Sequence, residues 1–372
     1  MALPEPKVIK AVTIGGAMLD SIAIVESDRI ERMAMRNADS SFLLLEEGRK
    51  TEATEISTHC GGGAVNSAVA LARLGCDVST VIKLGQDARA DQILSRLSEE
   101  GVSTRWVMRD PNAPTGASVL LSSHERDAAI FTFRGANTLL RASDLKADMF
   151  AVDLVYVSSL SNESADCFPE LIEIAKMDGA LVSTNPGIRQ LSTRADGFHA
   201  CLPLIDILSI NSAEADAMVP HMVSRFGEGG AALALKPGEA LPVLVARGLS
   251  SGGFEMTLAG FVSALLGVGL KHVVITAGAD GAYVGSPDGI RYCPTAPADV
   301  HGTAGAGDAF ASTFSALIAM DQPVERALHF ATLNAASVVA YADTQSGLLG
   351  LDQLDEKFRE SEADIAIRYW DL

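Results

Sequence analysis

Short apolar segments alternate with helical patterns along most of the chain, and this alternation constrains the fold more than any other feature. The strand-like segments are residues 11–17, 77–85, 153–159, 180–185, 206–211 and 272–278. Helical patterns lie between most of them, for example over 64–75 and 91–101, and both of these end at a glycine. Nearly continuous apolar strands joined by helices predict an α/β fold with a mainly parallel central sheet, flanked by helices on both faces.

Three segments depart from this alternation of strands and helices. Residues 21–59 are more charged and less regular, and residues 113–135 read as two strands around the polar turn SSHERD. Together these two segments predict a small β-lid beside the main sheet. Residues 220–255 are rich in Gly, Pro and Ala and predict an insertion or a mobile loop. The length of 372 residues fits a single α/β domain over 1–372 that carries these additions.

Composition and charge narrow the class of protein. Apolar residues make up 48% of the chain and charged residues 20%, which is typical of a globular protein. The formal net charge of −18 disfavours nucleic acid or an anionic membrane as a partner, but it leaves an anionic small substrate open. Five cysteines without a C-x-x-C pair argue against a disulfide framework. No signal-peptide pattern or membrane-length apolar run occurs, so we expect a cytoplasmic protein.

The stretch GTAGAGDAF, residues 302–310, carries the clearest chemical signal. Its glycines allow close backbone approach, and the apolar run that follows predicts a helix whose first N–H groups can bind an anion such as phosphate. We predict that Gly305, Ala306 and Gly307 supply that backbone, while Asp308 accepts the proton of a substrate hydroxyl. The competing interpretation is that Asp308 only caps the helix.

Further motifs occur along the chain in a consistent order. They are GGAMLD (15–20), GGGAVNSA (61–68), FRGAN (133–137), NSAE (211–214), TAGADGA (276–282) and GAGDAF (305–310). With them, the chain resembles the PfkB/ribokinase family of carbohydrate and nucleoside kinases over most of its length. The resemblance implies a ribokinase-like fold and transfer of the γ-phosphoryl group of ATP to a hydroxymethyl of a sugar. A nucleoside kinase of the adenosine type remains an alternative. So does a non-catalytic sugar- or nucleotide-binding regulator, although a regulator would be expected to lose Asp308 or its glycine loop.

The resemblance also implies roles for individual residues. Those that match the family's substrate side, under the lid, are Asp20, Gly62, Gly63, Asn66, Arg134 and Glu163. Those that match its nucleotide side are Asn211, Glu214, Thr276, Gly278, Gly281 and Asn334. Glu214 would act on Mg²⁺ largely through water, since Mg²⁺ keeps several waters and needs few protein ligands. Asn185 and Arg189 match a further segment that we interpret as mainly architectural.

One position departs from the family pattern. The usual motif D-T-x-G-A-G-D has Gly302 at its first position here, and Asp299 lies three residues earlier. In ribokinase-like members this aspartate helps to hold a monovalent cation, so activation by K⁺ is in doubt.

Pairing of lid strands between two copies would protect their edges, which leaves a homodimer open. The absence of G-x-x-x-x-G-K-[ST] excludes a P-loop kinase.

Overall fold

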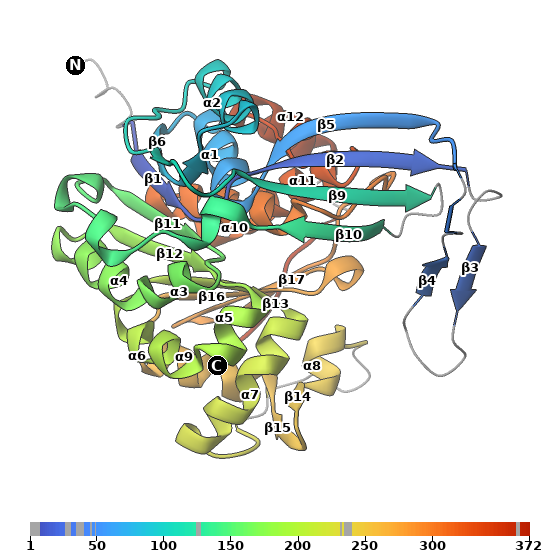
Figure 1. Ribbon diagram of the computed structural model, residues 1–372. Coiled ribbons are helices and arrows are strands. Elements are labelled where there is room, and N and C mark those ends of the chain that lie inside the picture. Colours follow the sequence, from blue (N-terminus) through green and yellow to red (C-terminus); the bar gives the residue numbers. More distant parts are fainter. Residues whose placement is uncertain are drawn as a thin grey trace, which may run out of the picture.

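A nine-stranded sheet forms the centre of the molecule (Figure 1). The computed structural model describes residues 8–26, 31–34, 41–44, 47–48, 50–123, 128–230, 233, 240–361 and 365–372. The strand order is β19-β18-β17-β16-β13-β12-β11-β1-β6, and the strands from β16 to β6 are parallel while β17, β18 and β19 are antiparallel. Their bounds are β1 Lys10–Ile14, β6 Asp77–Val81, β11 Leu154–Ser158, β12 Leu181–Asn185, β13 Ile207–Asn211, β16 His272–Thr276, β17 Ala282–Ser286, β18 Gly289–Cys293 and β19 Arg368–Trp370.

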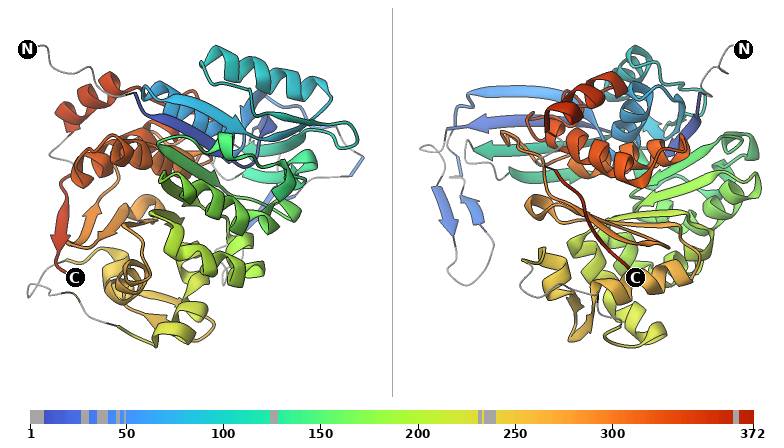
Figure 2. Two further views of the ribbon diagram at one scale, coloured as in Figure 1. Left: turned by 90° about the vertical axis from the view of Figure 1, so that its left-hand side faces the viewer. Right: turned by 180° about the vertical axis from the view of Figure 1, so that it is seen from behind.

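Helices cover both faces of this sheet (Figure 2). One face carries α3 Glu163–Asp166, α4 Phe168–Met177, α5 Ile188–Thr193, α6 Ala195–Cys201, α7 Ser212–Phe226, α8 Val243–Arg247 and α9 Leu258–Gly267. The other carries α1 Gly63–Arg73, α2 Ala88–Glu99, α10 Ala306–Ala319, α11 Val324–Val338 and α12 Leu351–Ser361. Short 3₁₀ helices are η2 Gly135–Thr138, η3 Ala142–Asp144, η4 Ala147–Met149, η5 Leu202–Leu204 and η6 Gly278–Asp280.

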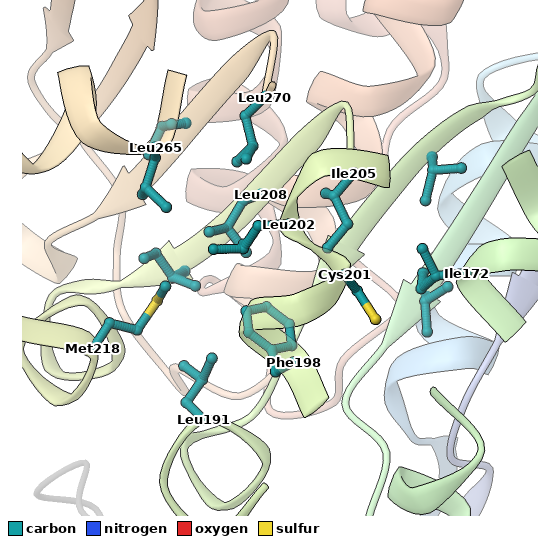
Figure 3. Close-up of a cluster of buried hydrophobic side chains, with 14 of the residues drawn as sticks. Ile172, Leu191, Phe198, Cys201, Leu202, Ile205, Leu208, Met218, Leu265 and Leu270 are labelled. Atoms are coloured by element: carbon teal, nitrogen blue, oxygen red, sulfur yellow. The ribbon is translucent and has the colours of Figure 1, made fainter. Parts of the chain in front are cut away.

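Alternate residues of the central strands pack into two separate cores. On β11, Val155 and Val157 point into the core beneath α4 to α9, whereas Leu154 and Tyr156 point into the core beneath α1, α10 and α11. Figure 3 shows part of the first core, where Phe198 and Leu202 lie beside Leu208 of β13. A strand that buries both faces needs apolar residues at every position, and this explains the apolar runs in the sequence. The predicted α/β class with a mainly parallel, doubly covered sheet is confirmed.

A second, four-stranded sheet extends from one side of the molecule (Figure 1). Its order is β10-β9-β2-β5, with bounds β2 Met18–Val25, β5 Glu55–Gly61, β9 Gly116–Ser123 and β10 Ala128–Phe133. These strands come mostly from the two segments predicted for the lid, but β2 already starts at Met18 and β5 extends to Gly61. A two-stranded ladder, β3 Glu31–Ala34 with β4 Ser41–Leu44, follows β2. The predicted turn at 124–127 lies outside the described residues.

Two segments differ in detail from the sequence prediction. Residues 77–85 were expected as one strand but form β6 and then β7 Lys83–Gly85, which pairs with β8 Met108–Asp110. Lys83, the first residue of β7, donates hydrogen bonds to the Asp144 carboxylate and to the carbonyl oxygen of Leu139. Within 220–255, α7 continues through Pro220, and the hairpin β14 Leu249–Ser251 with β15 Phe254–Met256 follows α8. Residues 231–232 and 234–239 lie outside the described part, so the insertion stays a prediction.

Across the ranges that the structure describes, no helix has the length and apolar character required to cross a membrane. The five cysteines are free thiols, and all but Cys60 are buried.

Candidate active site

The glycine-rich loop and the start of α10 lie at the carboxyl edge of the parallel strands. Gly305 is the N-cap of α10 and adopts a left-handed conformation with φ of 80°. A Cβ atom added to Gly305 would lie 2.7 Å from Cβ of Thr344, so only glycine fits this position. Two cavities of about 630 and 180 Å³ meet here and share Asn211, Thr276 and Gly307 as lining residues. Ligands of open α/β sheets bind at this edge.

Asp308 lies in the first turn of α10 and lines the smaller cavity. Its Oδ2 atom accepts a hydrogen bond of 2.8 Å from Nδ2 of Asn66 on α1. Burial raises the pKa of the Asp308 carboxyl, and the bond from Asn66 acts against this rise. Asp308 is therefore a carboxylate with an increased proton affinity, held by one amide and facing a cavity. Those are the properties of a general base.

The glycine run 61–63 lies between Asp308 and a second carboxyl group, that of Asp20. A Cβ atom on Gly63 would approach Oδ1 of Asp308 to 3.4 Å, and a Cβ atom on Gly61 would overlap Oδ2 of Asp20. Gly62 has a φ of 96°, and a Cβ there would lie 2.5 Å from a backbone oxygen. A Cβ atom on Gly63 would also lie 2.8 Å from Cβ of Ser158, so side chains are excluded along the whole run and its backbone packs closely between the two acids.

Asp20 is on β2, in register with His59 of β5 and Ser118 of β9. Its Oδ1 atom accepts a hydrogen bond from the Ser118 hydroxyl. Burial raises the pKa of Asp20, while the bond from Ser118 and the nearby His59 imidazole act in the opposite direction. Asp20, Ser118 and His59 form one polar group on the four-stranded sheet. Carboxylate, hydroxyl and imidazole groups are suited to bind the hydroxyls of a small polyol.

The larger cavity is mostly apolar, with polar groups at the end next to α10. Thr276, Gly278 and Gly281 line it, together with Val300 and Phe310. Gly281 has a φ of 94°, and a Cβ there would lie 2.4 Å from a carbonyl oxygen, so this glycine is required by the turn itself. An apolar cavity of this size with a few convergent polar groups is typical of a site for a nucleotide-sized ligand.

Asn211 and Glu214 form a capping box at the start of α7. The backbone N–H of Glu214 donates to Oδ1 of Asn211, and the backbone N–H of Asn211 donates to Oε2 of Glu214, each at 2.9 Å. Both residues also line the smaller cavity. Burial raises the pKa of Glu214, opposed by its bonds with Asn211. Asn211 and Glu214 can therefore cap α7 and still face a ligand in the smaller cavity.

Seven predicted site residues line neither of these two cavities: Asp20, Gly62, Gly63, Asn66, Arg134, Glu163 and Asn334. Two of them, Asn334 and Glu163, bond to groups elsewhere in the structure. Asn334 is fully buried, donates to Oγ1 of Thr313 and accepts from the backbone N–H of Leu349. Its amide is satisfied inside the core, and the neighbouring residues 335 and 336 line the larger cavity instead. Glu163, the first residue of α3, is mostly exposed and forms an ion pair with Arg141 at 3.4 Å.

Arg134 and Arg189 lie close to each other near the ends of β11 and β12. Nη1 of Arg134 donates to Oγ of Ser161 at 2.9 Å. Burial lowers the pKa of Arg134, and the charge of Arg189 lowers it further. Within the described part of the chain, neither guanidinium forms an ion pair with a carboxylate. Two neighbouring positive groups without a counter-charge are suited to bind an anion.

Comparison with known proteins identifies the family. The sequence model of the pfkB family of carbohydrate kinases matches residues 19–238 and 250–349. The chain belongs to this family. As a pfkB carbohydrate kinase, it is an enzyme that transfers a phosphoryl group from ATP to a sugar hydroxyl, and the enzyme prediction is confirmed.

Individual relatives agree with this assignment. A deoxyribokinase of Salmonella typhi is 26% identical over 341 residues, which cover 90% of this chain and 97% of the relative. An ATP-dependent ribose-1-phosphate kinase of Halopiger xanaduensis is 27% identical over 272 residues, 73% of this chain and 77% of the relative. Among solved structures, Arabidopsis thaliana ribokinase complexed with ribose and ATP has the same fold, with a TM-score of 0.68, 20% identity and coverage of 94% and 98%.

Sequence reasoning missed several residues that lie at the candidate site. His59 and Ser118 flank Asp20, while Thr344 and Gln345 bond to Asn66. His59 could have been found from its place two residues before the glycine run. The segment 343–346 carries no motif signal, because it reaches the site only through its fold.

Proposed function

We propose that this kinase phosphorylates a hydroxymethyl group of a sugar at the junction of the two cavities, with Asp308 as the general base. One observation carries the proposal. A carboxylate with a raised pKa occupies the first turn of a 14-residue helix, directly after a left-handed glycine, where both cavities meet. A proton acceptor beside free backbone N–H groups is the arrangement that phosphoryl transfer to an alcohol requires.

The chain's own groups have distinct roles in this proposal. The N–H groups of Ala306, Gly307 and Asp308 have no acceptor within the helix and stabilise the charge of the transferred phosphoryl group. Asp308 takes the proton of the sugar hydroxyl. Asp20 binds the sugar's other hydroxyls beneath the four-stranded sheet, which acts as the lid and excludes water.

ATP occupies the larger cavity in this proposal, with its phosphates toward α10. Glu214 fits a role in holding Mg²⁺ through water, because its carboxylate lines the smaller cavity close to Asp308. Mg²⁺ would offset the charge on the phosphate oxygens.

Replacement of Glu214 by glutamine tests this role. Glutamine can still complete the capping box, so α7 should keep its start while the negative charge is lost. We expect the Mg²⁺ concentration for half-maximal rate to rise by about 10–100-fold, with little change in the thermal unfolding midpoint. The measurement is the initial rate of ADP release as a function of Mg²⁺. An unchanged Mg²⁺ curve would contradict the role.

A second candidate is a sugar that already carries an anionic group. Arg134 and Arg189 favour it, since neither guanidinium forms an ion pair with a carboxylate among the described residues, and a phosphate or carboxylate on the substrate would supply a counter-charge. The similarity to an ATP-dependent ribose-1-phosphate kinase also supports this candidate.

A screen of ADP release separates the candidates. Neutral pentoses and hexoses, phosphorylated sugars, sugar acids and nucleosides are tested with the wild type and with the variants Arg134→Gln and Arg189→Gln. If the substrate is anionic, each variant should raise KM by about 10-fold or more. If it is neutral, the variants should behave like the wild type. If none of these acceptors leads to release of ADP, the proposed function is contradicted.

A further inference from the structure

The orientation of the Asn66 side-chain amide determines whether its NH₂ group or its oxygen faces the carboxylate of Asp308. With its NH₂ group toward Asp308, Asn66 donates a hydrogen bond of 2.8 Å to the carboxylate. With the amide turned by 180°, its oxygen would face the carboxylate and repel it. Some other part of the chain must therefore fix this orientation.

A line of hydrogen bonds runs from α2 to Asn66. Nε of Arg96 donates to Oε1 of Gln345 at 3.0 Å, and Nε2 of Gln345 donates to Oδ1 of Asn66 at 3.2 Å. Arg96 is itself held by Glu100, whose carboxylate lies 2.7 Å from Nη2. The line thus links a partly buried ion pair at the C-terminal end of α2 to the carboxylate of Asp308.

The direction of every bond in this line follows from its first member. Arginine carries only donors, so the group of Gln345 that faces Arg96 must be its oxygen. The NH₂ group of Gln345 then faces Asn66, where it can bond only to the amide oxygen. The NH₂ group of Asn66 is left to face Asp308.

Two further contacts reinforce this direction. Nε2 of Gln345 also donates to the carbonyl oxygen of Cys60 at 2.9 Å, which accepts only. Oγ1 of Thr344 donates to Oδ1 of Asn66 at 2.8 Å. Asn66, Thr344 and Gln345 are all buried, and the Asp343 side chain accepts from the backbone N–H groups of Gln345 and Ser346 and so holds their turn in place. Buried amides with every group bonded have a single orientation.

We propose that Gln345, oriented by Arg96 and assisted by Thr344, is a positioning residue that holds the NH₂ group of Asn66 toward Asp308. The inference rests on the proposed role of Asp308 as the base. Its consequence is that the hydrogen bond keeps Asp308 able to ionise in spite of its burial. In the described part of the chain, the titratable groups that interact electrostatically with Asp308 are Glu214 of α7 and Tyr156 of β11, and neither is among the hydrogen-bond partners of the Gln345 side chain.

The variant Gln345→Met tests the inference. Methionine has a similar length and no charge, but it cannot bond to Asn66 or Arg96. We expect the pKa of Asp308 to rise by about one unit, measured by ¹³C NMR titration of its carboxyl carbon, which is assigned through its loss in Asp308→Asn. The acid limb of kcat/KM for the sugar should move to higher pH by the same amount, with KM for ATP unchanged.

Matched variants make the result specific. Gln353→Met on α12 removes a glutamine that bonds only to the backbone of Gly350 in the described structure, so it should leave the pKa of Asp308 unchanged. Thr344→Val, which loses the hydroxyl, should raise this pKa, whereas Thr344→Ser should not. These two variants carry the test if Gln345→Met fails to fold.

The outcomes separate this inference from the proposed function. An unchanged Asp308 pKa in Gln345→Met, or in Thr344→Val where that variant carries the test, would overturn the positioning role, whatever the enzyme phosphorylates. If Asp308→Asn keeps normal turnover, the proposed base is wrong, while the NMR titration still reports how Asn66 is held.

Discussion

Replacement of Asp308 by asparagine is expected to lower kcat for sugar phosphorylation by about 10²–10⁴-fold. The reason is that asparagine cannot take the proton of the sugar hydroxyl, although it can still accept the hydrogen bond from Asn66. The KM for ATP should change little, because the nucleotide is expected in the larger cavity, which Asp308 does not line. Steady-state rates of ADP release across ATP and sugar concentrations measure both quantities.

The same substitution should not weaken the fold. Burial raises the pKa of Asp308, so the folded state prefers the protonated acid, and the ionised carboxylate costs stability once the pH exceeds the raised pKa. Asparagine removes that cost, and the thermal midpoint at pH 8 should be equal to or higher than that of the wild type. For the wild type, kcat/KM should fall as the pH drops through this raised pKa, above the usual range for aspartate near 3.9.

Asp352→Asn provides the matched control. Asp352 lies in the first turn of α12, is exposed and lines none of the cavities at α10. It should retain wild-type kcat. If Asp308→Asn has near-normal turnover, like this control, then Asp308 is not the general base.

Substitution of Gly305 by alanine is expected to lower kcat by about 10²–10³-fold, the usual effect of losing one well-placed backbone donor. Gly305 has a φ of 80°, and its new Cβ atom would lie 2.7 Å from Cβ and 3.0 Å from Cα of Thr344. The loop must therefore shift, which moves the N–H groups of Ala306 and Gly307 away from the phosphoryl group.

Backbone strain should also destabilise Gly305→Ala, by about 1–3 kcal/mol, as measured by urea unfolding. Gly267→Ala is the control for a glycine-to-alanine change, since Gly267 ends α9 and has no atom within 4 Å of an added Cβ. It should keep both stability and activity. Full activity of Gly305→Ala would show that the loop backbone does not contribute to phosphoryl transfer.

The sequence predicted the central sheet and its helices well because their signals are local. A strand such as β11 buries both faces, so its apolar run is visible without knowledge of its neighbours. The boundary of β2 was harder to predict. Only residues 15–17 separate Ile14, the last residue of β1, from Met18, the first residue of β2. The switch to a second sheet depends on the pairing of β2 with β5 and β9.

Site residues within continuous motifs were easier to predict than residues that depend on distant partners. Asp308 and Glu214 lie where their motifs imply, at the ends of strands or the starts of helices. Asn334 was expected near the nucleotide, but its amide bonds to Thr313 and to the backbone of Leu349, 21 and 15 residues away. Gln345 and Asn66 are 279 residues apart, and no local pattern indicates their contact.

A crystal structure of the Asp308→Asn variant with ATP, Mg²⁺ and the sugar that the wild type phosphorylates tests the central claim most directly, because slow turnover should preserve the reactants. We expect a hydroxymethyl oxygen of the sugar within hydrogen-bond distance of the side chain at position 308. The γ-phosphoryl group should face the N–H groups of Ala306 and Gly307. A sugar hydroxyl bound away from position 308, or a triphosphate bound outside the cavity at α10, would contradict the account.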